Sequence, residues 1–222
     1  MKPQTPSPKS QTKASPADVP LLRDAARWLL ISRLFECPND RWRREIAALA
    51  AEVGDPGLER AAAATGAATE GDYHSVFGPG GPAPPREVTY HASVELGSLM
   101  SELTGYYQAF GYRSALEEPP DHVAVEAGFV AYLRLKEAYA MRAGHPRQAV
   151  LARDAAERFR ADHVAAIAGP LAAFLAASGI DYLVQASQAL AAAAGTPPSD
   201  ARLPMLQPDE DDEGSEFPCC NS

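Results

Sequence analysis

The chain has 222 residues, enough for one hydrophobic core; 46% of them are hydrophobic, but only 8% are aromatic. Much of the apolar content is alanine, which favours helices over strands, so we expect an all-α fold with a single globular helical domain. The formal net charge of −9 repels phosphate backbones and excludes nucleic acid as an expected partner.

The two ends of the chain differ in composition from its middle. Residues 1–17 are rich in Pro, Ser, Thr, Gln and Lys, and residues 196–222 combine prolines with an acidic run. Neither segment has a periodic apolar face that would offset the entropy of ordering. We therefore predict a disordered N-terminal tail over 1–17, a helical domain over 18–195 and a disordered acidic C-terminal tail over 196–222.

Helical periodicity and capping residues predict the elements between these tails. Asp18 is the expected cap of a first helix that ends near Cys37, and Asp40 is the expected cap of a second that ends at Gly54. An alanine-rich stretch over 58–64 follows, and then a loop with aromatic residues on both sides, which contains the glycines and prolines of 78–85. Further helices are expected over 88–110, 122–142, 147–166, 170–177 and 180–194.

The most distinctive short segment is Glu118-Pro119-Pro120-Asp121-His122. Its prolines fix the backbone and present Asp121 and His122 at the start of a helix. Taken alone, this pattern favours a structural role in which Asp121 caps the helix and His122 is exposed in the first turn. A catalytic Asp–His pair is disfavoured, because adjacent helical residues point in different directions.

The spacing of cysteines and histidines and the length of apolar runs bear on metal binding, cofactors and cellular compartment. The three cysteines form neither a disulfide framework nor a zinc spacing, and no histidine lies four residues from another, so we expect no metal and no cofactor. No apolar run is long enough to cross a membrane, and the N-terminus lacks the apolar core of a secretory signal. We expect a cytoplasmic protein without membrane insertion.

Several segments, in their order along the chain, resemble the TorD/DmsD/NarJ family. They are Asp72-Tyr73-His74-Ser75-Val76-Phe77-Gly78, the proline-rich loop, Pro119-Pro120-Asp121-His122-Val123, Phe129-Val130-Ala131-Tyr132-Leu133 and Arg160-Ala161-Asp162-His163-Val164. The resemblance spans about residues 21–194. It implies a helical chaperone that binds the signal peptide or N-terminal region of an apo molybdenum oxidoreductase catalytic subunit until the cofactor is inserted.

The resemblance also implies where the client binds. Phe77, Pro85, Asp121 and His122 match positions implicated in peptide binding, and Glu118, Pro120 and Arg86 lie beside them. Arg86 replaces the aromatic residue that commonly follows the loop prolines. Its charge would repel a twin-arginine signal unless Glu87 or Glu118 offsets it, so a client without such a signal is also considered.

We expect the chaperone to be a monomer or weak dimer. Two alternative functions are also consistent with the sequence. One is a small helical hydrolase that uses Asp121 and His122, and the other is a permanent structural subunit of an oxidoreductase complex. A hydrolase requires a third polar group converging on His122, a permanent subunit requires an unusually large apolar patch, and a chaperone requires a groove beside the Pro-Asp-His turn.

Overall fold

A computed structural model describes residues 19–91 and 93–197. Within these ranges the regular structure is helical and no strand forms, which confirms the all-α prediction. The α-helices are α1 (Val19–Leu34), α2 (Asp40–Val53), α3 (Pro56–Ala64), α4 (Glu70–Phe77), α5 (Leu96–Phe110), α6 (Val123–Arg142), α7 (Pro146–Phe159), α8 (Ala165–Leu175) and α9 (Asp181–Ala194). Three short elements join them: η1 (Thr65–Ala67), η2 (Glu87–Tyr90) and η3 (Arg160–Val164).

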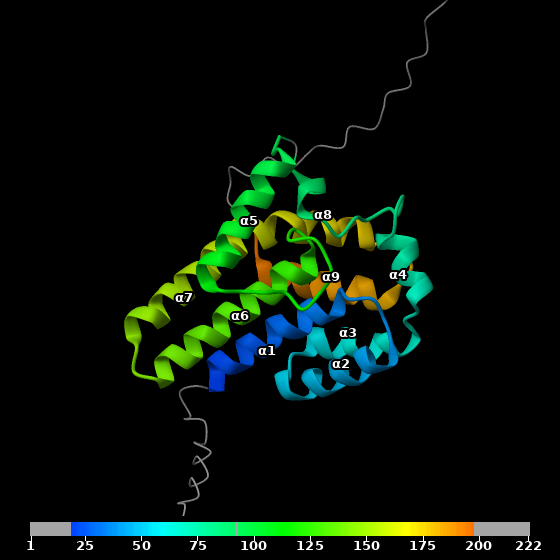
Figure 1. The fold of residues 1–222 in the computed structure, drawn as a ribbon. Coiled ribbons are helices and arrows are strands. Elements are labelled where there is room, and N and C mark those ends of the chain that lie inside the picture. The colour runs from blue at the N-terminus through cyan, green and yellow to red at the C-terminus, as the bar shows by residue number, and fades with distance from the viewer. Residues whose placement is uncertain (1–18, 92, 198–222) are drawn as a thin grey trace, which may run out of the picture.

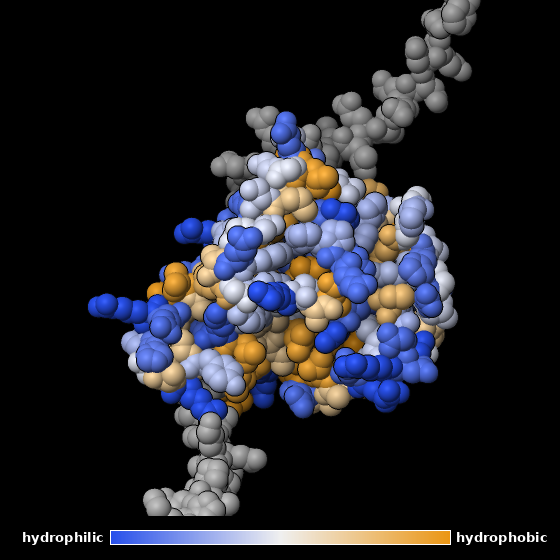
Figure 2. Space-filling view, in the orientation of Figure 1, coloured by the Kyte–Doolittle hydropathy of each residue, from blue (hydrophilic) through white to orange (hydrophobic). Residues whose placement is uncertain are grey.

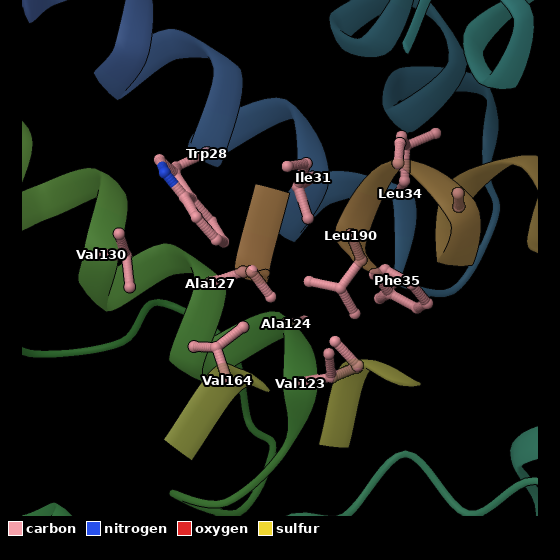
Figure 3. Packing of buried hydrophobic residues seen from close by; sticks show 14 of the residues in the cluster. Trp28, Ile31, Leu34, Phe35, Val123, Ala124, Ala127, Val130, Val164 and Leu190 are labelled. Atoms are coloured by element: carbon pink, nitrogen blue, oxygen red, sulfur yellow. The ribbon is translucent and has the colours of Figure 1, made fainter. Parts of the chain in front are cut away.

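The helices pack around α1 and α6, which lie side by side through the middle of the molecule (Figure 1). Both bury most of their surface, since α6 is apolar on nearly all sides and α1 also contacts α2, α3 and α9. Trp28 and Ile31 of α1, Val130 of α6 and Leu190 of α9 meet in the core (Figure 3). Helices α2, α3 and α4 lie at one end of this arrangement, and α5 and α7 at the other (Figure 1).

A glycine permits the close approach of α1 and α6. A Cβ at Gly128 would lie 2.8 Å from the Tyr112 hydroxyl and 3.2 Å from Ser32 Oγ. Ser32 uses the same space to donate a hydrogen bond to the Ala124 carbonyl at 2.7 Å. The small residue at 128 therefore sets the distance between the two central helices.

The cap of α2 lies one residue before the predicted one. Helix α2 begins at Asp40, but the cap is Asn39, whose side chain accepts a hydrogen bond from the Trp42 amide at 2.9 Å. The prediction of Asp40 as the cap was wrong by one residue, because Asn and Asp are almost equally good caps. The predicted cap Asp18 lies outside the described residues.

The region from 71 to 110 departs most from the prediction. The aromatic residues before Gly78 form α4, with a capping box between Thr69 and Asp72, so this part is a helix rather than a loop. The helix predicted over 88–110 divides into η2 and α5. Tyr90 explains part of the division, because its hydroxyl donates to the Pro84 carbonyl at 2.8 Å and ties η2 to the loop before it.

The helices near the C-terminal end also differ from the prediction. The predicted helix over 147–166 ends as α7 at Phe159 and is followed by a π-helical turn, η3. Pro170, predicted to start a helix, instead lies inside α8. Proline usually clashes with the Cβ of the residue before it, but Gly169 has no Cβ, so the helix continues.

The predicted tails, 1–17 and 196–222, lie outside the described residues except for 196 and 197. Among the described residues, no helix is both long enough and apolar enough to span a membrane.

Candidate functional site

The Pro-Asp-His turn is joined to the proline-rich loop by backbone hydrogen bonds. The Val123 amide donates to the Pro85 carbonyl at 2.9 Å, and the Glu87 amide donates to the Asp121 carbonyl at 2.9 Å. Arg86 and His122 form an isolated antiparallel bridge between these bonds. The two segments that carry most of the predicted site residues therefore form one short, rigid unit.

Asp121 and His122 are buried, so the expectation of a capping aspartate and an exposed histidine was wrong. Asp121 is 0% and His122 2% exposed. The cap of α6 is His122, whose Nδ1 accepts a hydrogen bond from the Ala124 amide at 3.1 Å. Asp121 fails as a cap because its carboxylate points to Arg86 and to the Val88 amide, 3.4 Å from Oδ2.

This arrangement does not form an Asp–His relay. The Asp121 carboxylate pairs with Arg86 Nε, and the nearest charged group recorded for His122 Nε2 is Glu118, whose Oε2 is 4.0 Å away. Burial, and then the charge of Arg86, lower the pKa of His122 to about 4. The imidazole is therefore neutral near pH 7, which agrees with its Nδ1 acting as an acceptor.

Arg86 is paired rather than free. Its guanidinium forms an ion pair with Asp121, whose carboxylate is fully buried, while about a third of the arginine side chain remains exposed. The sequence analysis looked to Glu87 or Glu118 for an offsetting charge. The structure assigns that role to Asp121, because Glu87 turns away from Arg86 into the interior.

Glu87 lies at the centre of a buried polar cluster that the sequence analysis missed. Its Oε1 is 2.8 Å from His91 Nε2, and both of its oxygens are 3.2 Å from His163 Nδ1 of the π-helical turn. Burial opposes ionisation of Glu87, but hydrogen bonds from His163 and His91 outweigh it and lower the pKa of Glu87. The hydrogen bond to Glu87 in turn raises the pKa of His91.

Glu126 of α6 completes this cluster. Its carboxyl group is fully buried and lies beside that of Glu87, to which a protonated Glu126 can donate a hydrogen bond. Burial, followed by the negative charge of Glu87, raises the pKa of Glu126 well above its usual range. Glu126 is thus neutral near pH 7 while Glu87 is ionised. An acid between Val125 and Ala127, on a helix apolar on nearly all sides, was the sequence signal for this burial.

The remaining predicted residues lie around this unit. Pro120 accepts a hydrogen bond from the Tyr107 hydroxyl at 2.7 Å, and Pro85 is buried under the loop. Glu118 is exposed beside His122. Phe77 is half-buried at the end of α4, packed on Tyr73 and Phe35 rather than on the Pro-Asp-His turn.

A groove of about 740 Å³ runs along the outer side of the same loop. Its wall is formed by the segment that carries Pro84 and Tyr90, and its floor by α8, including Gly169 and Phe174. None of its lining residues is charged. A Cβ at Gly169 would meet no atom within 4 Å, so this part of the floor is open. The groove suits apolar side chains of an extended segment.

A second, smaller apolar groove of about 400 Å³ lies between α1, α6 and the loop over 111–117. Leu29 and Leu135 line it and are each more than a third exposed. Figure 2 shows apolar side chains gathered in the middle of this face. Unlike the first groove, it has charged lining residues, Arg33, Glu36 and Arg113.

Comparison with known protein families decides the classification. The sequence profile of the nitrate reductase delta subunit family matches residues 38–179, which include α2 to α8 and the whole buried cluster. The chain belongs to this family. No curated protein and no solved structure matches the chain significantly. The nitrate reductase delta subunit family is a NarJ/TorD-type family of molybdoenzyme maturation chaperones, which confirms the resemblance to the TorD/DmsD/NarJ chaperones.

Proposed function

We propose that this member of the nitrate reductase delta subunit family is a dedicated cytoplasmic assembly chaperone. It binds the signal peptide or N-terminal region of an apo molybdenum oxidoreductase catalytic subunit and holds that subunit for cofactor insertion. The observation that carries the proposal is the uncharged groove between α8 and the loop joined to the Pro-Asp-His turn. Its volume of about 740 Å³ and its uncharged lining fit the side chains of a short peptide segment, and no bond-making step is needed.

The buried residues of the Pro-Asp-His turn support the groove instead of touching the client. Asp121 and His122 have almost no exposed surface, and both are joined to residues 85–88 by hydrogen bonds or backbone pairing. Pro84, Thr89 and Tyr90, on either side of that segment, line the wall of the groove. Asp121 and His122 are therefore positioning residues in the proposed function, as are Pro85 and Pro120.

Three exposed or partly exposed residues are proposed to contact the flanks of the client segment. Glu118 offers a carboxylate with a 43% exposed side chain, to which an arginine of the client could pair. Arg86 carries a charge that Asp121 largely offsets, so it no longer argues strongly against a twin-arginine signal. Phe77 adds an apolar surface at the end of α4.

The experiment that tests this proposal is affinity capture from the native cell extract, followed by identification of the bound proteins by mass spectrometry. We expect recovery of the catalytic subunit of a molybdenum oxidoreductase, depleted of its cofactor relative to the mature enzyme. Recovery of the subunit only as part of the mature complex would instead indicate a permanent structural subunit. Failure to recover any such subunit would contradict the proposal.

A further inference from the structure

Three potential metal ligands, none of which the proposed function uses, meet beside α4. Cys37 lies in the connection between α1 and α2, and Glu70 and His74 lie one turn apart on α4. The Cys37 Sγ is 4.0 Å from His74 Nε2, and His74 Nε2 is 3.5 Å from Glu70 Oε1. One ligand atom of each of the three residues lies within 4.8 Å of the others.

These distances are close to those of a tetrahedral zinc site. Zinc bonds of about 2.0–2.3 Å to nitrogen, oxygen and sulfur place neighbouring tetrahedral ligands roughly 3.3–3.6 Å apart. The separation of His74 and Glu70, 3.5 Å, lies within this range, and that of Cys37 and His74, 4.0 Å, exceeds it slightly. The ligand atoms of Cys37 and Glu70 lie within 4.8 Å of each other. Small side-chain rotations at this partly exposed position would close the difference.

Packing holds the two segments that contain the proposed ligands, the α1–α2 connection and α4, against each other. The Tyr73 hydroxyl donates to the Phe35 carbonyl at 3.4 Å, which ties α4 to the end of α1. Phe77 packs on Tyr73 and Phe35, with ring centroids 5.0 and 6.3 Å away. The segment with Cys37 and the helix with His74 are thus held in place without a metal, which reduces the ordering that binding requires.

The electrostatic surroundings favour a cation at this place. Two carboxylates, those of Glu70 and Glu118, lie close enough to the Cys37 thiol to act on it electrostatically. Glu118 is not one of the three ligand residues, so the cluster has a further carboxylate within electrostatic reach. A bound divalent ion would offset these charges.

We propose that Cys37, Glu70 and His74 bind one divalent transition-metal ion, with Zn²⁺ the best match to their mixed sulfur, nitrogen and oxygen donors. Three protein ligands leave a fourth position, on the exposed side, for water or an incoming ligand. The expectation of no metal rested on the absence of a zinc-type cysteine spacing and of histidines four residues apart. Neither pattern can detect a histidine and a cysteine that lie 37 positions apart in the chain. The proposal is independent of the chaperone function.

The test is a Zn²⁺ titration of the full-length protein against a chromogenic chelator. Cys219 and Cys220 are adjacent thiols that could themselves bind zinc, so the parent protein should carry C219S and C220S. We expect one saturable site in this parent and an affinity at least about tenfold lower after C37S or H74A. The matched control is H145A, which removes an exposed histidine that caps no helix through its side chain; its affinity should equal that of the parent.

Substitution of Co²⁺ for Zn²⁺ provides a second measurement that reports the ligands directly. A thiolate-to-cobalt charge-transfer band should appear in the parent and vanish in C37S, while circular dichroism shows that each variant stays folded. The absence of a saturable site in the parent would overturn the proposal. It would also be overturned if C37S and H74A bound zinc like the parent, or if only C37S lost affinity.

Discussion

Arg86 and Asp121, 35 positions apart in the chain, form an ion pair in which the carboxylate is fully buried and the guanidinium is partly exposed. The pair joins the loop after α4 to the turn before α6. If Arg86 is replaced by Met, Asp121 keeps only the Val88 amide at 3.4 Å and becomes a poorly compensated buried charge. We expect the free energy of unfolding to fall by about 2–4 kcal/mol.

A double-mutant cycle with Asp121→Asn separates the loss of the ion pair in Arg86→Met from a simple loss of packing. The double variant no longer carries an unpaired buried charge at position 121, so it should regain part of the stability lost in Arg86→Met. Urea unfolding of the four proteins measures the coupling. Additive losses in the double variant would show that the ion pair does not determine the position of the loop.

The two glutamates of the buried cluster, Glu87 and Glu126, should respond differently to the same substitution. Glu126 is neutral near pH 7, so Glu126→Gln removes no charge, and the amide of the glutamine can still donate to Glu87; the melting temperature near pH 7 should be unchanged or raised. Glu87→Gln removes the charge that His91 and His163 contact and should cost about 2–3 kcal/mol. Thermal unfolding of both variants checks the difference; equal losses would contradict the assigned ionisation states.

His122 should make the fold sensitive to mild acid. Its pKa is about 4 in the folded protein against an ordinary value of 6.5, so the unfolded chain takes up the proton first as the pH falls. The stability that this histidine contributes is present above pH 6.5 and is lost between pH 6.5 and 4, by about 3 kcal/mol near pH 4. Urea unfolding of the wild-type protein at several pH values in this window measures the loss.

Other groups titrate in the same window, so a variant must isolate the effect of His122. Asn is a good helix cap and does not titrate, which makes His122→Asn the matched comparison. Its stability should depend less steeply on pH than that of the wild-type protein between pH 6.5 and 4. Parallel pH profiles for the two proteins would contradict a buried neutral imidazole.

The spacing of α1 and α6 depends on Gly128. Gly128→Ala would place a methyl group 2.8 Å from the Tyr112 hydroxyl, and we expect a loss of about 1–3 kcal/mol. Tyr112→Phe removes that hydroxyl oxygen, and alanine is the better helix former, so Gly128→Ala should be much less harmful in the Tyr112→Phe background. Calorimetry of the single and double variants tests this; an unchanged penalty would place the clash at Ser32 instead.

Much of the architecture could be predicted from local patterns, and the failures have identifiable physical causes. The stretch from Val123 to Arg142 was correctly predicted as a central helix because its apolar residues surround it. Pro170 misled the prediction, because proline usually starts or ends a helix, and the effect of Gly169 before it was not considered. Local patterns also gave no sign of the π-helical turn that brings His163 to Glu87.

The site was harder to predict than the fold, because its residues meet only through tertiary contacts. The family resemblance selected Asp121 and His122, but burial and partners decide what they do. Their burial could not be inferred from Pro119 and Pro120 before them, which indicate a turn but not the side of it that faces the core. The partner of Arg86 lies 35 positions away, beyond the range of local capping and helix-pairing rules.

The central claim is that the groove between α8 and the loop joined to the Pro-Asp-His turn binds the client segment, and Ala173 allows it to be tested without damage to the fold. Ala173 is an exposed residue of α8 that lines the groove, and methionine is a good helix former, so Ala173→Met should fill the groove and keep the helix. Ala51 of α2 is an exposed helical alanine outside this groove, which makes Ala51→Met the matched control.

The most direct measurement is an isothermal titration of the wild-type protein, Ala173→Met and Ala51→Met with the N-terminal peptide of the captured oxidoreductase subunit. We predict that the wild-type protein and Ala51→Met bind the peptide with equal affinity, and that Ala173→Met binds it at least about tenfold more weakly, a loss of about 1.4 kcal/mol. Equal affinity of all three folded proteins would contradict the central claim.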